Sequence, residues 1–207
     1  MTFEELIAEG RKLERPCLLL RPHGEGPVVA VWHERNRDEI ASTGHRAWLT
    51  VDARHVPGLS ASTAGYPTIF TDQKRCQGGR VEQSASWPKR AGTPLYAHAA
   101  SVLPPIDAVF ARGSQAVADW LASHGNENFP GATAVEKYED LWMKEFPLYT
   151  SDDIYAVLGG WHMAWPEGDW HDFIDGQLMV FTLRDSEPWV EAWHMASGEF
   201  RVVQRIT

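Results

Sequence analysis

Cysteine is scarce in this sequence, with two in 207 residues. Cys17 and Cys76 lie far apart and in unlike surroundings, so the sequence indicates no disulfide framework. Reduced thiols of this kind are typical of a cytoplasmic protein. A chain of this length buries enough apolar surface to fold without cross-links or a structural metal ion.

Long apolar runs are also missing. No segment approaches the roughly 20 apolar residues that a helix needs to cross a bilayer, and residues 1–14 lack the apolar run of a signal peptide. Hydrophobic residues make up 43% and charged residues 23%, as in an ordinary globular protein. We therefore expect one soluble cytoplasmic domain over residues 1–207, or its subdivision into 1–103 and 104–207.

Positive charge is sparse in the second half of the chain. Residues 106–207 hold 6 Lys and Arg against 17 Asp and Glu, residues 1–105 hold 13 against 11, and the net charge is −9. An acidic half repels nucleic-acid backbones, so such binding could start only in the basic stretch Lys74–Arg90. The acidic half is either a solvated surface that keeps the protein soluble or a face that attracts a basic protein or a cationic ligand.

Apolar spacing predicts several elements in the first half. Thr2 and Glu5 have capping-box spacing and predict an N-terminal helix. Apolar runs and alternation predict strands, and small turn-forming residues predict a surface loop. The strands are expected at 16–21, 27–33, 45–53 and 68–71, and the loop at 56–66. Residues 82–105 contain four prolines and little periodicity, so we expect an irregular crossing there.

The second half predicts helices followed by strands. Apolar stripes predict helices over 106–121 and 133–146. Three strands with short loops, at 177–184, 188–195 and 199–206, must be antiparallel neighbours. Residues 154–163 fit either a further strand or the start of a short helix capped by Ser151. The predicted fold class is α+β, a mostly antiparallel sheet with helices packed on one face and a C-terminal three-stranded meander.

Tryptophan and histidine are adjacent more often than chance predicts. With 10 Trp and 9 His in the chain, chance placement gives about 0.4 Trp-His pairs, yet the sequence has four. They are Trp32-His33, Trp161-His162, Trp170-His171 and Trp193-His194. The tetrapeptide WHMA occurs twice, but nothing longer is repeated around it, so no structural repeat is indicated.

The densest cluster of these residues is the segment 161–172, WHMAWPEGDWHD. Its candidate binding residues are Trp161, His162, Trp165, Asp169, Trp170 and His171. A loop with so many large aromatics must fold back onto the protein. It is either an aromatic loop that closes one end of the sheet or a pocket wall in which the polar tips of His162, Asp169 and His171 point at a ligand.

The predicted strand 188–195 supplies the remaining candidates. Trp189, Glu191 and Trp193 alternate onto one face, and His194 lies on the other among small apolar residues. We expect the His194 face to pack on the helices. The two tryptophan rings, about 13 Å apart along the strand, are either core or a platform for an extended ligand such as a sugar chain.

Motifs for metal binding and covalent catalysis are lacking. The sequence has no HxH or HExxH spacing, and no spacing predicts that His162, His171, His194 and Glu191 converge on one ion. It has no GxSxG elbow and no P-loop. Cys76 has basic neighbours, which favour a thiolate, but no histidine near it in sequence. We expect neither a metal site nor a cofactor.

These patterns favour a binding function over catalysis. The leading hypothesis is a non-catalytic interaction protein whose acidic, Trp/His-rich C-terminal surface contacts a basic protein partner, for example in a toxin-neutralising role. One alternative is a hydrolase-like enzyme with a pocket built from His162, His171, His194 and carboxylates, with or without a metal ion. Another is carbohydrate binding on the Trp189 and Trp193 face.

Overall fold

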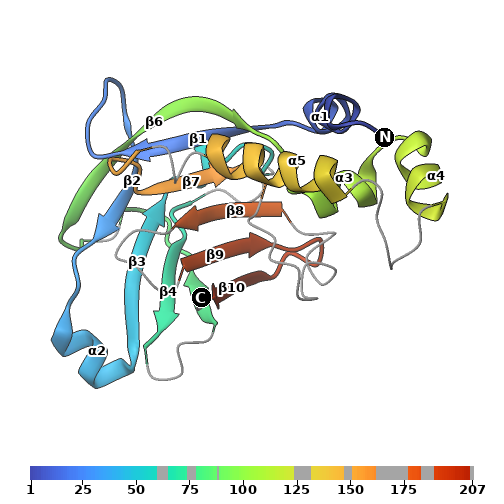
Figure 1. Cartoon of the computed structure of the whole chain (residues 1–207). Coiled ribbons are helices and arrows are strands. Elements are labelled where there is room, and N and C mark those ends of the chain that lie inside the picture. Colours follow the sequence, from blue (N-terminus) through green and yellow to red (C-terminus); the bar gives the residue numbers. More distant parts are fainter. Residues whose placement is uncertain are drawn as a thin grey trace.

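A computed structural model describes the chain in eight segments: residues 1–59, 65–73, 78–87, 89–123, 132–146, 151–161, 177–182 and 189–205. Within these residues ten strands form one sheet in the order β10-β9-β8-β7-β1-β6-β2-β3-β4-β5, and every neighbouring pair is antiparallel. Helices pack beside the sheet (Figure 1). The predicted α+β class and the C-terminal meander, β8-β9-β10, are confirmed.

The elements have the following bounds. The strands are β1 (Arg15–Arg21), β2 (Val28–His33), β3 (His45–Val51), β4 (Thr68–Asp72), β5 (Gly79–Glu82), β6 (Gly92–Val102), β7 (Ala156–Gly159), β8 (Gln177–Thr182), β9 (Trp189–His194) and β10 (Phe200–Arg205). The helices are α1 (Phe3–Lys12), α2 (Arg37–Thr43), α3 (Ile106–Arg112), α4 (Gln115–Ser123) and α5 (Ala132–Glu145), with a 3-10 turn at Ala53–His55.

The sheet curls until its two outermost strands, β10 and β5, lie side by side (Figure 1). The Gln204 side-chain amide of β10 donates hydrogen bonds to the carbonyl oxygens of Asp72 and Gly78. A glycine is required at the contact, because a Cβ atom on Gly79 would lie 2.9 Å from a methyl carbon of Val202 and 2.0 Å from the Phe70 carbonyl oxygen. Closing the sheet in this way also protects its edges from pairing with other chains.

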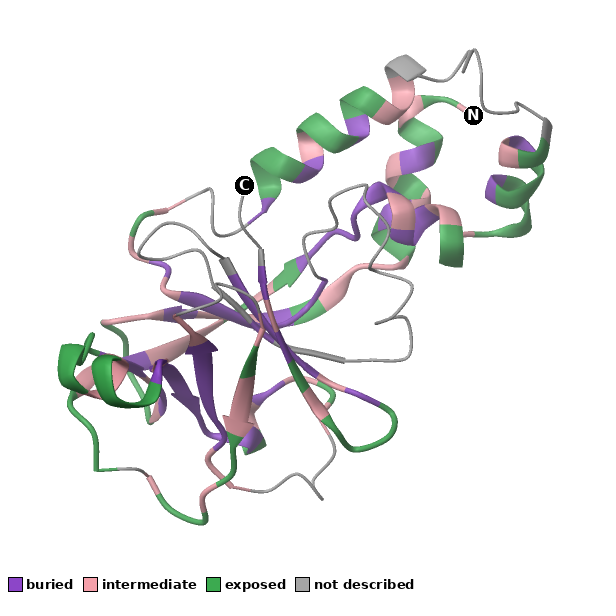
Figure 2. Cartoon of the chain, turned by 90° about the horizontal axis from the view of Figure 1, so that it is seen from below, coloured by how far each residue is buried: buried purple, intermediate pink, exposed green. Residues whose placement is uncertain are grey.

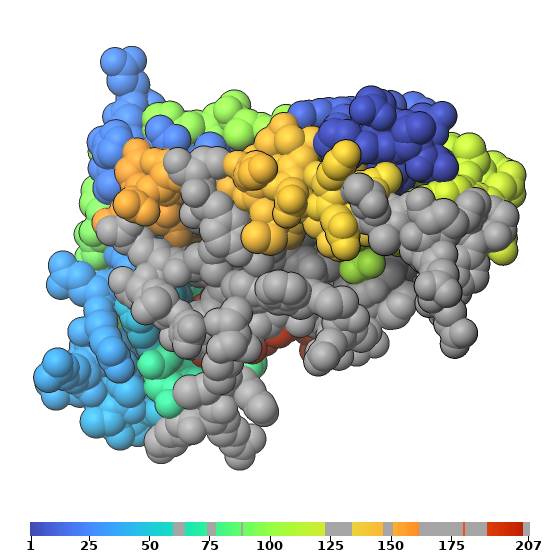
Figure 3. Space-filling model, viewed as in Figure 1, coloured from blue at the N-terminus to red at the C-terminus, as the bar shows by residue number. Residues whose placement is uncertain are grey.

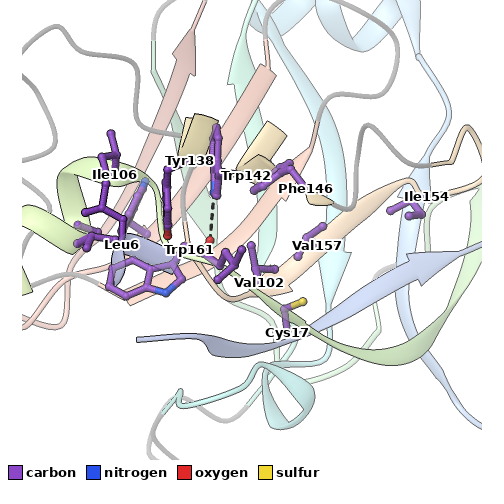
Figure 4. Packing of buried hydrophobic residues seen from close by; sticks show 14 of the residues in the cluster. Leu6, Cys17, Val102, Ile106, Tyr138, Trp142, Phe146, Ile154, Val157 and Trp161 are labelled. Carbon is purple, nitrogen blue, oxygen red and sulfur yellow. Dashed lines mark hydrogen bonds between the residues drawn. The ribbon is translucent and has the colours of Figure 1, made fainter. Parts of the chain in front are cut away.

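The curled sheet is buried on both faces, so the protein has two hydrophobic cores (Figure 2). Along β1, Leu18 and Leu20 contribute to the core inside the curl, while Cys17 and Leu19 contribute to a second core outside it. That alternation follows from the pleat of a strand. Helices α1, α3 and α5 cover the outer core, which we call the helix-side core (Figure 4).

Aromatic side chains of α5 join the helix-side core to the chain around it. The Tyr138 hydroxyl donates to the Pro104 carbonyl oxygen at 3.0 Å, and the Trp142 ring nitrogen donates to the Leu103 carbonyl oxygen at 3.0 Å. Tyr138, Trp142 and Phe146 are all buried, as the apolar stripe of the predicted helix 133–146 indicated. The predicted capping box is present on α1, where Thr2 and Glu5 exchange backbone-to-side-chain hydrogen bonds of 2.7 and 3.2 Å.

Two of the predictions of secondary structure were wrong. Residues 82–105 were expected to be irregular, but β6 is an 11-residue strand that pairs with both β1 and β2. Its alternation is hidden because small and half-buried residues occupy most of it. The helix expected over 106–121 is broken at Gly113 into α3 and α4. At Gly113 the backbone is extended, and a Cβ atom would lie 2.5 Å from the Val109 carbonyl oxygen.

Two further elements, β7 and α2, add to the predictions from sequence. Residues 156–159 form strand β7, which decides between the two alternatives left open for that region. Helix α2 was not expected; Asn36 starts it by accepting hydrogen bonds from the backbone N–H groups of Asp38 and Glu39, both at 3.1 Å. Gly44 ends it with a φ of 75°. Among the described residues, no helix is long and apolar enough to cross a membrane.

Candidate functional site

The predicted C-terminal site is only partly visible. His162, Trp165, Asp169, Trp170 and His171 lie outside the residues that the structure describes, as does the side chain of Trp189. Whether they line a pocket therefore stays a prediction. The described candidates are Trp161, Glu191, Trp193 and His194.

Trp161 belongs to the helix-side core (Figure 4). Its side chain is 5% exposed, and its ring nitrogen donates a hydrogen bond of 2.8 Å to the Leu13 carbonyl oxygen. The guanidinium carbon of Arg15 lies 3.6 Å from the ring centroid, a cation–π stack. The ring nitrogen and the ring face of Trp161 are thus both engaged within the protein. Trp161 thereby fixes the end of β7 to the end of α1.

The orientation of β9 is the reverse of the expected one. Val190 and Ala192 lie in the core inside the curl, whereas Trp193 lies in the helix-side core. The prediction that the His194 face packs on the helices was therefore wrong. The pairing of β9 fixes this orientation, because Ala192 lies opposite Val180 of β8 and Val202 of β10, which belong to the same core.

Glu191 and Trp193 are both buried on this outward face. The exposed fraction is 0% for Glu191 and 3% for Trp193, and the Trp193 ring nitrogen donates to a Glu191 carboxylate oxygen at 3.1 Å. A buried Trp193 removes one of the two rings that a carbohydrate platform would need. His194, on the opposite face, is half-buried with its ring centroid 5.0 Å from that of Phe200.

A cluster of like charges lies on the outer side of α3 and α5. Partial burial, followed by repulsion from Asp107, Glu136 and Asp140, raises the pKa of Glu139. Among the described residues, none of Glu136, Glu139 and Asp140 forms an ion pair. We call Asp107, Glu136, Glu139, Asp140 and Met143 together the α5 acidic face.

Met143 gives this face an apolar component. Its side chain is 47% exposed and is the one large hydrophobic residue classed as exposed in the described part of the chain. On a helix it neighbours Glu139, four residues earlier, and Asp140, three residues earlier. Helix α5 lies on the face of the molecule shown in Figure 3, and Glu136, Glu139, Asp140 and Met143 are all exposed.

A second candidate site, which the sequence analysis missed, is a pocket of about 730 Å³ beside α2. We call it the α2 pocket. It is lined by His33, Glu34, Arg35, Asn36, Arg37, Glu39, Ala47, Lys89, Arg90 and Ala91. The segment from β2 to α2 forms one wall, and the residues just before β6 form another.

A chain of hydrogen bonds runs from the α2 pocket into the sheet. The His33 imidazole lies 2.7 Å through Nε2 from the Thr50 hydroxyl, which lies 2.7 Å from the Thr68 hydroxyl. On the other side, His33 Nδ1 lies 3.4 Å from the Ala91 carbonyl oxygen. With Nδ1–H donating to that carbonyl, Nε2 accepts from Thr50.

His33 is held in its neutral form. Burial, above all, lowers the pKa of His33, and the charge of Arg90 lowers it further, against opposing effects of the Ala91 carbonyl and Glu39. Since both ring nitrogens are engaged, His33 builds the base of the pocket and presents no free nitrogen to a ligand.

No protein-family model, curated protein or solved structure matches this chain. Function must therefore be argued from the two candidate sites themselves. Within the described part of the chain, no three His, Cys, Asp or Glu side chains are grouped as a metal site would require.

The sequence contained a signal for the α2 pocket. The Trp32-His33 pair is one of four such pairs, and nothing in the dipeptide itself distinguishes it from the other three. The run of alternating charges from Glu34 to Glu39 follows it directly. Only the sheet order shows that this run meets Lys89 and Arg90, because β6 pairs with β2.

Proposed function

We propose that this chain is a non-catalytic interaction protein of the cytoplasm, and that its α5 acidic face binds a basic protein partner. The observation that carries the proposal is the grouping of exposed carboxylates Glu136, Glu139 and Asp140 on one face of α5, where partial burial followed by repulsion from acidic neighbours raises the pKa of Glu139. Among the described residues Glu136, Glu139 and Asp140 form no ion pair, and like charges held close together in this way are unfavourable in the free protein. A partner's lysine or arginine side chains relieve that repulsion and gain attraction at once.

The exposed side chain of Met143 supports the proposal independently. Methionine is enriched in protein interfaces and adapts to different apolar surfaces. An apolar side chain one helical turn from two carboxylates, Glu139 and Asp140, suits a basic partner with an apolar residue of its own. Toxin neutralisation is one form that such binding takes.

Two buried groups favour binding over catalysis. Burial raises the pKa of the Cys17 thiol to about 12, so this thiol stays protonated and is a poor nucleophile. The imidazole of His33 uses both nitrogens within the protein. The hydrolase-like alternative depends on His162 and His171, which lie outside the described residues.

The test is a binding titration with a defined probe, a 20-residue amphipathic Lys/Leu peptide carrying a fluorophore, followed by fluorescence anisotropy. The double variant Glu136→Lys/Asp140→Lys should bind it at least about tenfold more weakly than wild type, because two attractions become repulsions. Met143→Ser should weaken binding about threefold by removing the apolar contact.

A matched control separates the α5 acidic face from net charge. Glu25→Lys/Glu199→Lys changes the net charge equally at two exposed carboxylates elsewhere, and it should weaken binding less than about twofold at physiological salt. Equal weakening in both double variants would mean that only bulk charge attracts the peptide, which would refute a defined binding face.

A further inference from the structure

The α2 pocket concentrates positive charge in a protein whose net charge is −9. Four of its lining residues are Arg or Lys and two are Glu. Arg35, Arg37 and Lys89 are exposed, and none of them forms an ion pair or side-chain hydrogen bond with another described residue. These three cations are available to a ligand.

Two other charged residues of the pocket lining, Arg90 and Glu39, are already paired with each other. Arg90 pairs with Glu39 through two hydrogen bonds of 2.7 and 2.8 Å, and its guanidinium carbon lies 5.3 Å from the centroid of Phe70. Both bonds come from Arg90 Nη1, and this ion pair links α2 to the segment before β6 across the pocket. The pocket is therefore preorganised, because a ligand does not need to draw its walls together.

We propose that the α2 pocket binds a small phosphate monoester, with Arg35, Arg37 and Lys89 around the phosphate group. A phosphate carries close to two negative charges and three terminal oxygens, so it can pair with three cations at once. A carboxylate is satisfied by one bidentate arginine and would leave the others unpaired.

The size of the pocket favours an ester over inorganic phosphate. A volume of about 730 Å³ lies within the range of small-molecule sites and leaves room for an organic group beside the phosphate. Glu34 is a lining carboxylate that can accept hydrogen bonds from hydroxyl groups of that organic part. A small molecule is favoured over a nucleic acid because a protein of this net charge repels a long polyanion.

This site is independent of the proposed partner-binding function. Helices α2 and α5 lie apart in both cartoon views (Figures 1 and 2). The phosphate ester would act as a ligand and not as a substrate of His33, whose nitrogens are engaged with Thr50 and Ala91. One protein can thus bind a metabolite at α2 and a basic partner at α5.

The test uses four probes in isothermal titration against the full chain: glucose 6-phosphate, glucose, citrate, and a single-stranded dT oligonucleotide without a terminal phosphate. We expect saturable binding of glucose 6-phosphate below about 1 mM and none of glucose. Citrate and the oligonucleotide should bind at least about tenfold more weakly than glucose 6-phosphate. Backbone amide shifts on titration should be largest at residues 33–39 and 89–91.

Matched double variants assign the binding to the pocket. Arg35→Ala/Arg37→Ala should weaken glucose 6-phosphate binding at least about tenfold. Lys137→Ala/Lys144→Ala removes the same charge from exposed positions on α5 and should leave it within about twofold. Since all four side chains are exposed, both variants should keep the wild-type melting temperature.

Several results would overturn the proposal. These are the absence of saturable phosphate-ester binding up to about 10 mM, an equal loss in the two double variants, and amide shifts centred elsewhere. Tighter binding of citrate would refute the preference for phosphate, and tighter binding of the oligonucleotide would refute the small-molecule ligand. None of these outcomes depends on the binding of a basic peptide at α5.

Discussion

Two strands of this protein carry the same dipeptide, Trp-His, in opposite orientations. In β2, Trp32 points into the core inside the curl and His33 points out to the α2 pocket. In β9, Trp193 points out to the helix-side core, and His194 shares the inward face with Ala192. The comparison teaches that the dipeptide is not a functional unit, because the pleat and the register of each strand decide which ring meets which layer.

The two tryptophans should both be essential for stability, and their replacement has the largest expected effect. Trp193→Ala creates a cavity in the helix-side core and removes the hydrogen bond to buried Glu191, so it should lower the free energy of unfolding by about 3–5 kcal/mol. Trp32→Ala should cost a similar amount, because Trp32 makes edge-to-face contacts with Trp48 and Tyr155 at 5.2 and 5.6 Å.

Urea unfolding of both variants measures these costs. Trp193→Phe is the informative control, because it keeps most of the ring but loses the donor to Glu191, and it should cost about 1–3 kcal/mol. If Trp193→Ala cost less than about 1 kcal/mol, Trp193 would not be buried as described, and the carbohydrate platform would regain its second ring.

The two histidines should differ in their contribution to the free energy of unfolding, whereas the two tryptophans should contribute similar amounts. His33 is 2% exposed and has a partner on each ring nitrogen, so His33→Ala should cost about 2–3 kcal/mol by leaving buried polar groups unpaired. His194 is half-buried beside Phe200, and His194→Ala should cost less than about 1 kcal/mol. Equal costs in urea unfolding would remove the distinction between the two pairs.

The comparison also explains how far the sequence alone can predict this fold. The stripe of Tyr138, Trp142 and Phe146 predicted α5 and its buried face, because a helix buries residues at a fixed period. The orientation of β9 was not predictable, because both faces of a strand in a curled sheet are buried and each set of residues combines apolar side chains with one polar residue, Glu191 or His194. Composition then no longer distinguishes inside from outside.

The sites show the same limit for a different reason. The acidic character of the second half was visible in the sequence, and α5 places part of it on one exposed face. The α2 pocket was not visible, because its walls are more than 50 residues apart in sequence, as the Glu39 to Arg90 pair shows. Pairing of β6 with β2 brings them together, and β6 was itself missed.

Breaking the chain of hydrogen bonds from His33 through the Thr50 and Thr68 hydroxyl groups should have an intermediate effect on the free energy of unfolding. Thr50 is 0% exposed and lies between His33 and Thr68, 2.7 Å from each partner. Thr50→Val keeps the shape of the side chain but leaves both partners without this hydrogen bond, so it should cost about 1–2 kcal/mol in urea unfolding. Thr50→Ser, which keeps the hydroxyl group, should recover most of that loss. A valine variant as stable as wild type would show that His33 does not depend on the chain.

The smallest effect should be seen in the pH dependence of stability. Burial lowers the pKa of His33 below the ordinary histidine value of about 6.5, so between the two pKa values the unfolded chain binds a proton that the folded chain does not. Neutral His33 therefore contributes full stability above pH 6.5, and that contribution is lost as the pH falls through 6.5 toward the lower, folded-state value.

The variant His33→Gln has no such group, and its side-chain amide can still donate to Thr50. Its unfolding free energy should fall less steeply than that of wild type between about pH 7 and pH 5. Measuring both proteins at about pH 8, where imidazole is neutral in either state, separates the cost of the substitution from its effect on the slope. Parallel pH profiles would mean that His33 is as accessible to protons as in the unfolded chain, and the base of the α2 pocket would then be open to water.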